Sequence, residues 1–195
     1  LTGGATVTVT ANCTAPCSSS TDGNIVVANS ITSAGAGTLT LNADRDLIVN
    51  AGVTITSNLA TNPLNLNFNA AQNANNGHLL LSGGSASLVS LQSNGGDVNL
   101  TAGTASIYAD VAAIWSNIQT HGGRVTIQNG SAGSYINSAQ TGVTNFGVSL
   151  GLSCHNVGQS VCQTVSNVGD VNIDAAGGDI TVAGFNSGGW HGLNI

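Results

Sequence analysis

Charged residues are rare in this sequence. Only 5% of its 195 residues are charged, lysine and glutamate are absent, and eight aspartates against two arginines leave a formal net charge of −6. A globular domain usually carries charge on about a quarter of its residues, so Asn, Thr, Ser and backbone groups must solvate this surface. Two isolated arginines cannot neutralise a row of phosphates, so we expect neither a nucleic-acid partner nor docking on anionic lipid.

Long apolar runs and proline are scarce as well. No stretch approaches the roughly 20 apolar residues that cross a bilayer as a helix, so we expect no membrane insertion. The chain has only 2 Pro but 27 Gly, which favours many tight turns and few interruptions of hydrogen-bonded ladders. Disorder is a poor interpretation because 41% of the residues are hydrophobic and the net charge is low.

A short glycine-bounded pattern is present in several copies. Glycine and Asp or Arg precede two apolar residues that are separated by one Asn or Thr, the period-2 pattern of a half-buried strand. The clear copies are residues 96–100, 123–127, 169–173 and 178–182, and the looser ones are 23–27, 37–41 and 77–81. A unit this small cannot bury its apolar side alone, so the copies must stack on one another.

The spacing between copies predicts how they stack. Val98 and Val125 are 27 positions apart, Val125 and Val171 are 46 apart, and an offset of nine links Val98 to Ile107 and Val171 to Ile180. These distances predict two or three short strands in a coil of roughly 20 to 27 residues. With inter-strand spacing near 4.8 Å, the chain would form about eight coils and a rod on the order of 40 Å long.

We therefore predict an all-β chain that folds as a right-handed parallel β-helix. A single domain would cover residues 1–195, with a loop-rich insertion at 138–168. Residues 109–119 show some helical periodicity, but the segment is short, rich in β-branched residues and bounded by turn signals, so strand is favoured there too.

Four cysteines indicate an oxidising compartment. Cys13 and Cys17 flank a short turn, and Cys154 and Cys162 bracket a glycine-containing loop. Three connectivities exist for four cysteines, and we predict the two local ones, Cys13 with Cys17 and Cys154 with Cys162, as disulfide-stapled loops of a secreted protein. Neither gap matches the tight paired spacing of structural zinc, so we expect no metal at these residues.

The aspartates raise the question of calcium. Asp44 and Asp46 lie close together, and Asp170, Asp174 and Asp179 cluster towards the C-terminal end. Asp170 and Asp179 follow glycine directly, and we interpret all five aspartates as turn residues whose short carboxylate binds its own backbone. The nonapeptide calcium repeat is not present in series. We therefore expect no bound metal and no cofactor.

Catalytic constellations are missing from the pattern. Polysaccharide lyases and hydrolases built on β-helices gather several Asp with an Arg or Lys on one face. Here Arg45 and Arg124 are 79 positions apart, and Asp170 with Asp174, or Asp174 with Asp179, would sit at strand edges where turn residues are expected anyway. The four histidines are isolated: His78, His121, His155 and His191. We predict no enzymatic activity.

Two tryptophans require separate interpretations. Trp190 stands between glycines in residues 188–192, where little covers it unless a partner or a neighbouring coil does. Sugar stacking on this ring is one interpretation, and capping of the core or a subunit contact is the favoured one. Trp115 follows an apolar stretch and is predicted to lie in the core.

The repeats resemble the shaft of filamentous-haemagglutinin-like exoproteins, which are bacterial proteins of the two-partner secretion type. Residues 93–100 are similar to that repeat, and so are 39–49 and 64–70; the likeness covers roughly residues 37–136 and 167–184. The Asn-Pro-Asn motifs of the family's secretion domain are missing. The resemblance implies a shaft segment of an extracellular protein, and the paired cysteines depart from the pattern.

The ends of the predicted rod carry no cap, and this feature predicts how the protein functions. The chain begins directly in a strand pattern, so we expect a processed chain or a segment of a longer one. Uncapped ends favour head-to-tail stacking into a homopolymer. The candidate interface residues are Val7, Val9, Trp190 and Leu193. We predict a secreted structural protein of the bacterial surface, either a fibre subunit or an adhesin shaft.

Two alternatives remain open at this point. The first is carbohydrate binding or processing along the flank of the rod, with cell-surface glycans as partners and Trp190, Tyr108, Tyr135 and the C-terminal aspartates as the candidate surface. The second is ice binding, which needs a regular array of outward Thr; the outward positions here alternate irregularly between Asn and Thr.

Overall fold

The computed structural model of the chain describes residues 4–14, 22–73, 76–103, 108–129, 148–150, 152–153, 167–183 and 193–194. Within these ranges there are nineteen strands and no helix, which confirms the expectation of an all-β chain. Nothing helical in the described part is long and apolar enough to span a membrane.

Three parallel sheets contain almost all of these strands. Sheet A consists of β1 (Ala5–Ala11), β4 (Gly37–Ala43), β7 (Leu64–Ala70), β10 (Val98–Ala102), β13 (Val125–Asn129) and β18 (Ile180–Ala183). Sheet B consists of β2 (Ile25–Val27), β5 (Leu47–Asn50), β8 (Asn76–Ser82), β11 (Tyr108–Ile114), β14 (Val148–Leu150) and β19 (Leu193–Asn194). Sheet C consists of β3 (Ile31–Ser33), β6 (Thr54–Ser57), β9 (Val89–Gln92), β12 (Ser116–Gln119) and β17 (Val171–Asp174). A separate antiparallel pair is formed by β15 (Leu152–Ser153) and β16 (Asn167–Val168).

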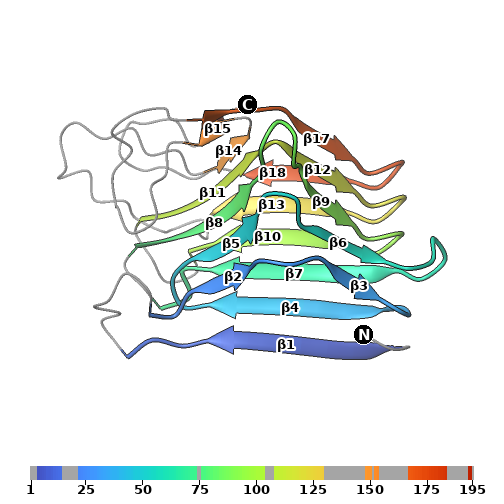
Figure 1. Cartoon of the computed structure of the whole chain (residues 1–195), viewed down its shortest axis with the longest axis horizontal. Coiled ribbons are helices and arrows are strands. Elements are labelled where there is room, and N and C mark those ends of the chain that lie inside the picture. The colour runs from blue at the N-terminus through green and yellow to red at the C-terminus, as the bar shows by residue number, and fades with distance from the viewer. Residues whose placement is uncertain are drawn as a thin grey trace.

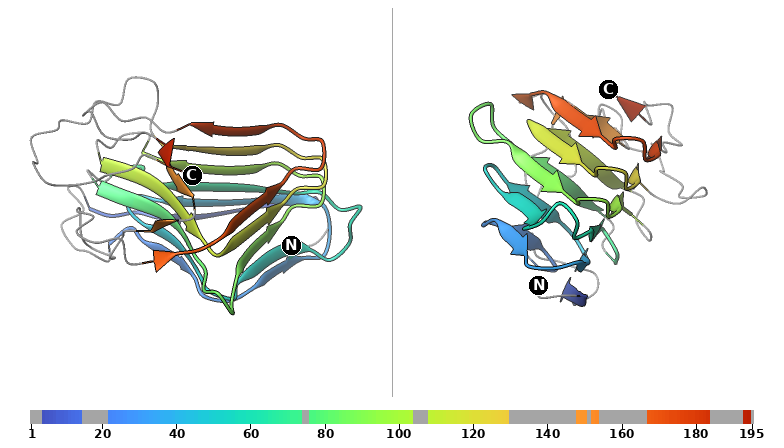
Figure 2. Two further views of the ribbon diagram at one scale, coloured as in Figure 1. Left: turned by 90° about the horizontal axis from the view of Figure 1, so that it is seen from above. Right: turned by 90° about the vertical axis from the view of Figure 1, so that its right-hand side faces the viewer.

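The chain visits the three sheets in a fixed order. Each coil runs from sheet B through sheet C to sheet A, as β5, β6 and β7 do, and then returns to sheet B one strand further along. Figure 1 shows the strands of sheet A stacked from β1 beside the N-terminus to β18, and Figure 2 shows from above that successive coils superimpose. Stacked parallel sheets of this kind form a solenoid-like fold.

The register confirms one predicted spacing and corrects the number of coils. Val98 pairs with Val125, 27 positions on. The preceding step in sheet A, from Asn67 to Asn99, is 32 positions. This coil is therefore longer than the expected roughly 20 to 27 residues, and the step from β13 to β18, between Val125 and Ile180, is longer still. The expected eight coils are too many for the described part of the chain, where sheet A contains six strands, which at a spacing of about 4.8 Å span only about 24 Å.

The repeat copies do not all belong to one sheet. Val171 pairs with Ser116 in sheet C, whereas Ile180 pairs with Val125 in sheet A. The 46-residue spacing from Val125 to Val171 therefore does not join stacked strands. The nine-residue offset from Val171 to Ile180 is confirmed as the step from β17 to β18 within one coil; Ile107 lies outside the described residues.

Inward-facing side chains of the three sheets form one apolar core. Strand β7 shows the pattern clearly, because Leu64, Leu66, Phe68 and Ala70 are buried and the three asparagines between them are half-exposed. The period-2 pattern of the sequence therefore becomes an inside and an outside. Phe68 is the largest of the fully buried side chains in this core.

Paired glycines form the corner between sheets C and A in three successive coils. The first of each pair, Gly95, Gly122 or Gly177, has φ between 96° and 107°, where side chains are strained. The second has no room for a side chain: a Cβ on Gly123 would lie 2.0 Å from the carbonyl oxygen of Gly96, and one on Gly178 would lie 2.2 Å from that of Gly123. The glycine of the sequence repeat is thus required by close backbone contact between coils.

A column of buried hydroxyl groups runs beside this corner. The sheet C register stacks Ser33, Ser57, Ser93 and Thr120, all buried. Each hydroxyl donates to a backbone carbonyl of its own turn, for example Ser33 Oγ to Gly35 O at 2.6 Å and Ser57 Oγ to Leu59 O at 3.2 Å. The turn takes these carbonyls out of the hydrogen bonds between strands. The Ser or Thr hydroxyl then supplies the donor that a buried carbonyl requires.

Two further predictions concern residues 109–119 and residues 138–168. The preference for strand over helix at residues 109–119 is confirmed by β11 and β12. The predicted insertion at 138–168 lies in the long connection between β13 and β18, which are neighbours in sheet A because Val125 pairs with Ile180. Within it, β14 continues sheet B and β15 begins the antiparallel pair. Most of that range lies outside the described residues, so its loop-rich character stays a prediction.

Candidate functional site

Two apolar columns cross every strand of sheet A and reach both ends of the stack. One contains Val7, Leu39, Leu66, Val98, Val125 and Ile180 in register. The other contains Val9, Leu41, Phe68, Leu100, Ile127 and Val182. Their inner members are almost completely buried, whereas the terminal Val9 and Ile180 are 45% and 49% exposed. Nothing in the described part of the chain covers the ends of these columns.

The N-terminal end of the stack is the free edge of β1. This seven-residue strand is the first in sheet A and pairs with β4. Val7 is half-buried against the core, and Val9 is exposed. An edge strand of this length presents unpaired backbone donors and acceptors, which can add another strand. The predicted interface residues Val7 and Val9 therefore lie together at one end.

The C-terminal end of the stack is formed by β18, β17 and β19, the last strands of sheets A, C and B. Leu193 lies here, since β19 pairs with β14 with Leu193 opposite Val148. Trp190 lies outside the described residues. The sequence reasoning missed Ile180 as a candidate interface residue, although it occurs in the last copy of the repeat and so has no later copy to cover it.

Outward side chains of the stacked coils form amide ladders. Asn99 Nδ2 donates to Asn67 Oδ1 at 2.8 Å in sheet A, and Asn172 Nδ2 donates to Asn117 Oδ1 at the same distance in sheet C. Such side-chain bonds between neighbouring strands stabilise the register. At these positions the outward asparagines therefore bond to one another across coils as well as face solvent.

An exposed ion pair joins two coils near the glycine corner. Arg124 donates from its backbone N–H to Asp97 Oδ1 at 2.8 Å and from Nη2 to Asp97 Oδ2 at 2.9 Å. The backbone hydrogen bond is the larger cause and the side-chain bond the next, and together they hold the pKa of the Asp97 carboxyl below its ordinary value. The same pairing raises the pKa of Arg124.

This pair predicts a small acid-dependent loss of stability. Because the folded pKa of Asp97 is depressed, its contribution is complete above the unfolded pKa of about 3.9 and is lost as the pH falls through the lower folded value. The pair is exposed, so its effect is small. Between neutral and acid pH, we expect the Tm of Asp97→Asn to fall by about 1 to 3 °C less than the Tm of the wild type. Thermal unfolding followed by circular dichroism at pH 7 and pH 3 measures this. An equal decrease in Asp97→Asn and the wild type would contradict it.

The aspartates near Arg45 bond differently from what the sequence suggested. Asp44, Arg45 and Asp46 are buried at the corner between β4 and β5. Asp44 Oδ2 accepts the backbone N–H of Cys13 at 2.9 Å, and Asp46 Oδ1 accepts that of His78 at 3.1 Å. The expectation of bonds to their own turn is wrong here, because both carboxylates bind backbone of neighbouring coils. In the described part of the chain, no group of three or more His, Cys, Asp or Glu side chains could hold a metal ion.

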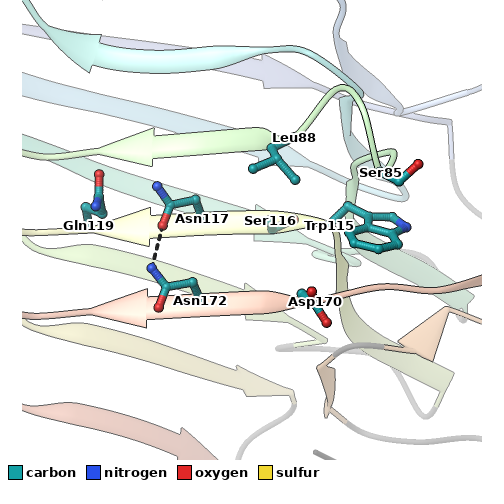
Figure 3. A pocket seen from close by; sticks show the side chains of 8 residues that line it. All are labelled: Ser85, Leu88, Trp115, Ser116, Asn117, Gln119, Asp170 and Asn172. Carbon is teal, nitrogen blue, oxygen red and sulfur yellow. Dashed lines mark hydrogen bonds between the residues drawn. The ribbon is translucent and has the colours of Figure 1, made fainter.

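A hollow of about 450 Å³ lies on the outer side of sheet C, where it meets sheet B (Figure 3). It is lined by Ser85, Leu88, Trp115, Ser116, Asn117, Gln119, Asp170 and Asn172. Its size follows from loop lengths: six residues, 83–88, connect β8 to β9, whereas only Trp115 connects β11 to β12. Trp115 is half-exposed and lines the hollow, so the expectation that it lies in the core is wrong.

Several predicted site residues lie outside the described residues, namely Cys17, Cys154, Cys162, Trp190 and Tyr135. Cys13 is disulfide-bonded. Its pairing with Cys17, and that of Cys154 with Cys162, stay predictions. Tyr108 begins β11, and its side chain is not among those described.

Comparison with protein-family models, with characterised proteins and with solved structures finds no match for the chain. The resemblance to filamentous-haemagglutinin-like shafts therefore stays an expectation, and function has to be inferred from the chain's own geometry.

Proposed function

We propose that the chain is a structural segment of a secreted bacterial surface protein, a fibre subunit or adhesin shaft that works by stacking coil on coil. The observation that carries this proposal is the pair of apolar columns in sheet A, which the described part of the chain covers everywhere except at the two ends. We take the coil as right-handed, because parallel crossover connections almost always are.

The ends of the stack complement each other. At one end, Ile180 and Val182 lie on top of the columns; at the other, Val7 and Val9 lie beneath them. A second copy placed in the same orientation would set its β1 against β18 as one more parallel strand of sheet A. Each buried valine or isoleucine contributes about 1.5 to 3 kcal/mol. This contact is head-to-tail and does not close, so repetition builds a filament.

The same geometry serves a shaft within a longer chain. Solenoid coils contact only their neighbours, so any number can be added without changing the rest. The disulfide at Cys13 agrees with an oxidising, extracellular location. Low charge on the described outer faces, where Asn and Thr dominate, limits repulsion between copies.

Lysine at the N-terminal end is expected to stop end-to-end association. In Val7→Lys/Val9→Lys, two ammonium groups would have to be buried against β18 of the next copy, which costs more than the lost apolar contact. We expect the dissociation constant to rise at least about tenfold. Light scattering and negative-stain electron microscopy measure the assembly, and circular dichroism checks the fold.

The matched control carries the same charges on the same strand. Thr6 and Thr8 are exposed and outside the columns, so Thr6→Lys/Thr8→Lys should assemble like the wild type. Mixing Val7→Lys/Val9→Lys with Ile180→Lys gives a further test, because each variant keeps the end that the other lacks and discrete dimers should form. A wild type that stays monomeric at high concentration would refute self-association. Assembly unaltered by lysine at Val7 and Val9 would refute stacking through β1 and β18.

A further inference from the structure

Trp115 occupies a corner position that does not itself require an aromatic residue. It is the only residue between β11 and β12, and its φ of 45° lies in the left-handed region, which bulky side chains rarely adopt. The sheet B register pairs Ile114 with Ser82 and Ser82 with Asn50, so the next position is Gly83 or Ala51 in the preceding coils. Small residues occupy the same corner there, so the geometry of the corner does not explain why position 115 carries an indole.

The indole packs on the backbone of a neighbouring segment. A Cβ added to Gly169 would lie 2.5 Å from Cδ1, Cε2 and Nε1 of Trp115, so the ring lies directly on the Gly169 backbone. The ring also lines the hollow, beside Asp170 and Ser85 (Figure 3). An aromatic ring that is seated on backbone and half-exposed to a hollow is pre-organised to receive a ligand, since little rotamer entropy remains to be lost.

Neutral hydrogen-bonding groups extend from the ring along the hollow. Asn117 and Gln119 project from β12, and Asn172 lies on β17. The bond from Asn172 Nδ2 to Asn117 Oδ1 orients both amides and leaves the two N–H donors of Asn117 and an acceptor of Asn172 for a ligand. Of the lining residues that the structure describes, only Asp170 is charged.

We propose that this hollow binds a neutral sugar residue of a glycan. The apolar C–H face of a pyranose ring would stack on Trp115, and its hydroxyls would exchange hydrogen bonds with Asn117, Asn172 and Asp170. Amides both donate and accept, which matches hydroxyl groups. Among the described residues that line the hollow there is no cation to bind a phosphate, sulfate or carboxylate, which disfavours anionic ligands. Its volume is within the about 300 to 1,000 Å³ of small-ligand sites.

A proline-rich peptide is the competing ligand, because such peptides also dock on aromatic grooves. The observations favour the sugar, since proline has no N–H and offers little to three amide side chains and a carboxylate. The hollow opens on the outward side of sheet C, but Asn172 lies on β17, the last strand of that sheet. Binding is therefore measured on Val7→Lys/Val9→Lys, which keeps this end and is expected to stay monomeric.

Tryptophan fluorescence tests the proposal directly. The chain has two tryptophans, so a Trp190→Phe background leaves Trp115 as the only indole. The probes are neutral hexasaccharides of glucose, galactose, mannose or N-acetylglucosamine, with a polyproline peptide in parallel, titrated to beyond about 1 mM. We expect at least one hexasaccharide to give a saturable change in Trp115 fluorescence, confirmed by calorimetry.

Variants then assign binding to the hollow. Trp115→Asn keeps the left-handed turn, as Asn94 does at φ 50°, and should weaken binding measured by calorimetry at least tenfold. Asn172→Ala should weaken it several-fold. Its matched control is Asn99→Ala, which removes an equal ladder bond of 2.8 Å on sheet A and should bind like the wild type.

Three results would overturn the proposal. They are no response to any hexasaccharide, a response to polyproline alone, or sugar binding that survives both Trp115→Asn and Asn172→Ala. Because Asn172→Ala removes only an exposed amide, it stays informative even where Trp115→Asn alters the fold.

Discussion

Replacing Phe68 with alanine is expected to lower the free energy of unfolding by about 3 to 5 kcal/mol. Phe68 is fully buried and lies between Leu41 and Leu100 in the second apolar column of sheet A. The strands on both sides are fixed by ladder hydrogen bonds, so the coils cannot close over the cavity that the missing ring leaves. Urea unfolding followed by circular dichroism measures the loss.

Val26→Ala is the control for this prediction. Val26 lies on β2 and is 54% exposed, so its truncation should change stability by less than about 0.5 kcal/mol. A loss of less than about 1 kcal/mol in Phe68→Ala would mean that the column is not packed as described.

Gly123→Ala is expected to destabilise the chain by about 3 kcal/mol or more, at the upper end of what overpacking costs. The added Cβ would lie 2.0 Å from the carbonyl oxygen of Gly96, and backbone cannot rotate away as a side chain can. The coil of Gly123 is also held from the other side, because Gly178 packs against it. Thermal unfolding compared with the wild type measures the effect.

Two further glycines give a graded comparison. A Cβ on Gly84 would meet nothing within 4 Å, and its φ is not positive, so Gly84→Ala should be close to neutral. Gly178→Ala meets a similar clash, but β18 is the last strand of sheet A and can move outward, so the loss should be smaller than for Gly123→Ala. Equal melting temperatures for Gly123→Ala and the wild type would show that the coils are further apart than described.

The candidate site was only partly predictable from the sequence. Val7 and Val9 were predicted from the strand pattern of residues 6–10, and both lie on β1, the edge strand of sheet A among the described strands. Ile180 was missed, since its triplet looks like the inner copies, and only the absence of a covering strand exposes it. The Trp115 hollow was not foreseen, because an apolar approach to a tryptophan suggests core, whereas a one-residue corner with positive φ turns the ring outward.

Two aspartates show the same difference between what a local sequence pattern predicts and what tertiary contacts decide. Asp174 accepts the N–H of Ala176 two residues on, the local bond that its place before a turn predicts. Asp44 instead binds the backbone of Cys13, 31 positions away. Both residues have the same short carboxylate in a turn-rich context. The difference depends on which coil lies alongside, and no local pattern contains that information.

By itself, the sequence determined that this chain is built of short parallel strands and that its coils repeat at 27 positions between Val98 and Val125. Period-2 alternation and paired glycines are local properties, and they fix which residues face inward and where each turn occurs. Only the tertiary structure decided that the triplet at 169–173 belongs to sheet C, that six strands and not eight coils stack in sheet A, and that Trp115 lines a surface hollow. The physical reason is that these features depend on register between coils, which is set by loop lengths such as 83–88 and by contacts between residues about 27 to 55 positions apart.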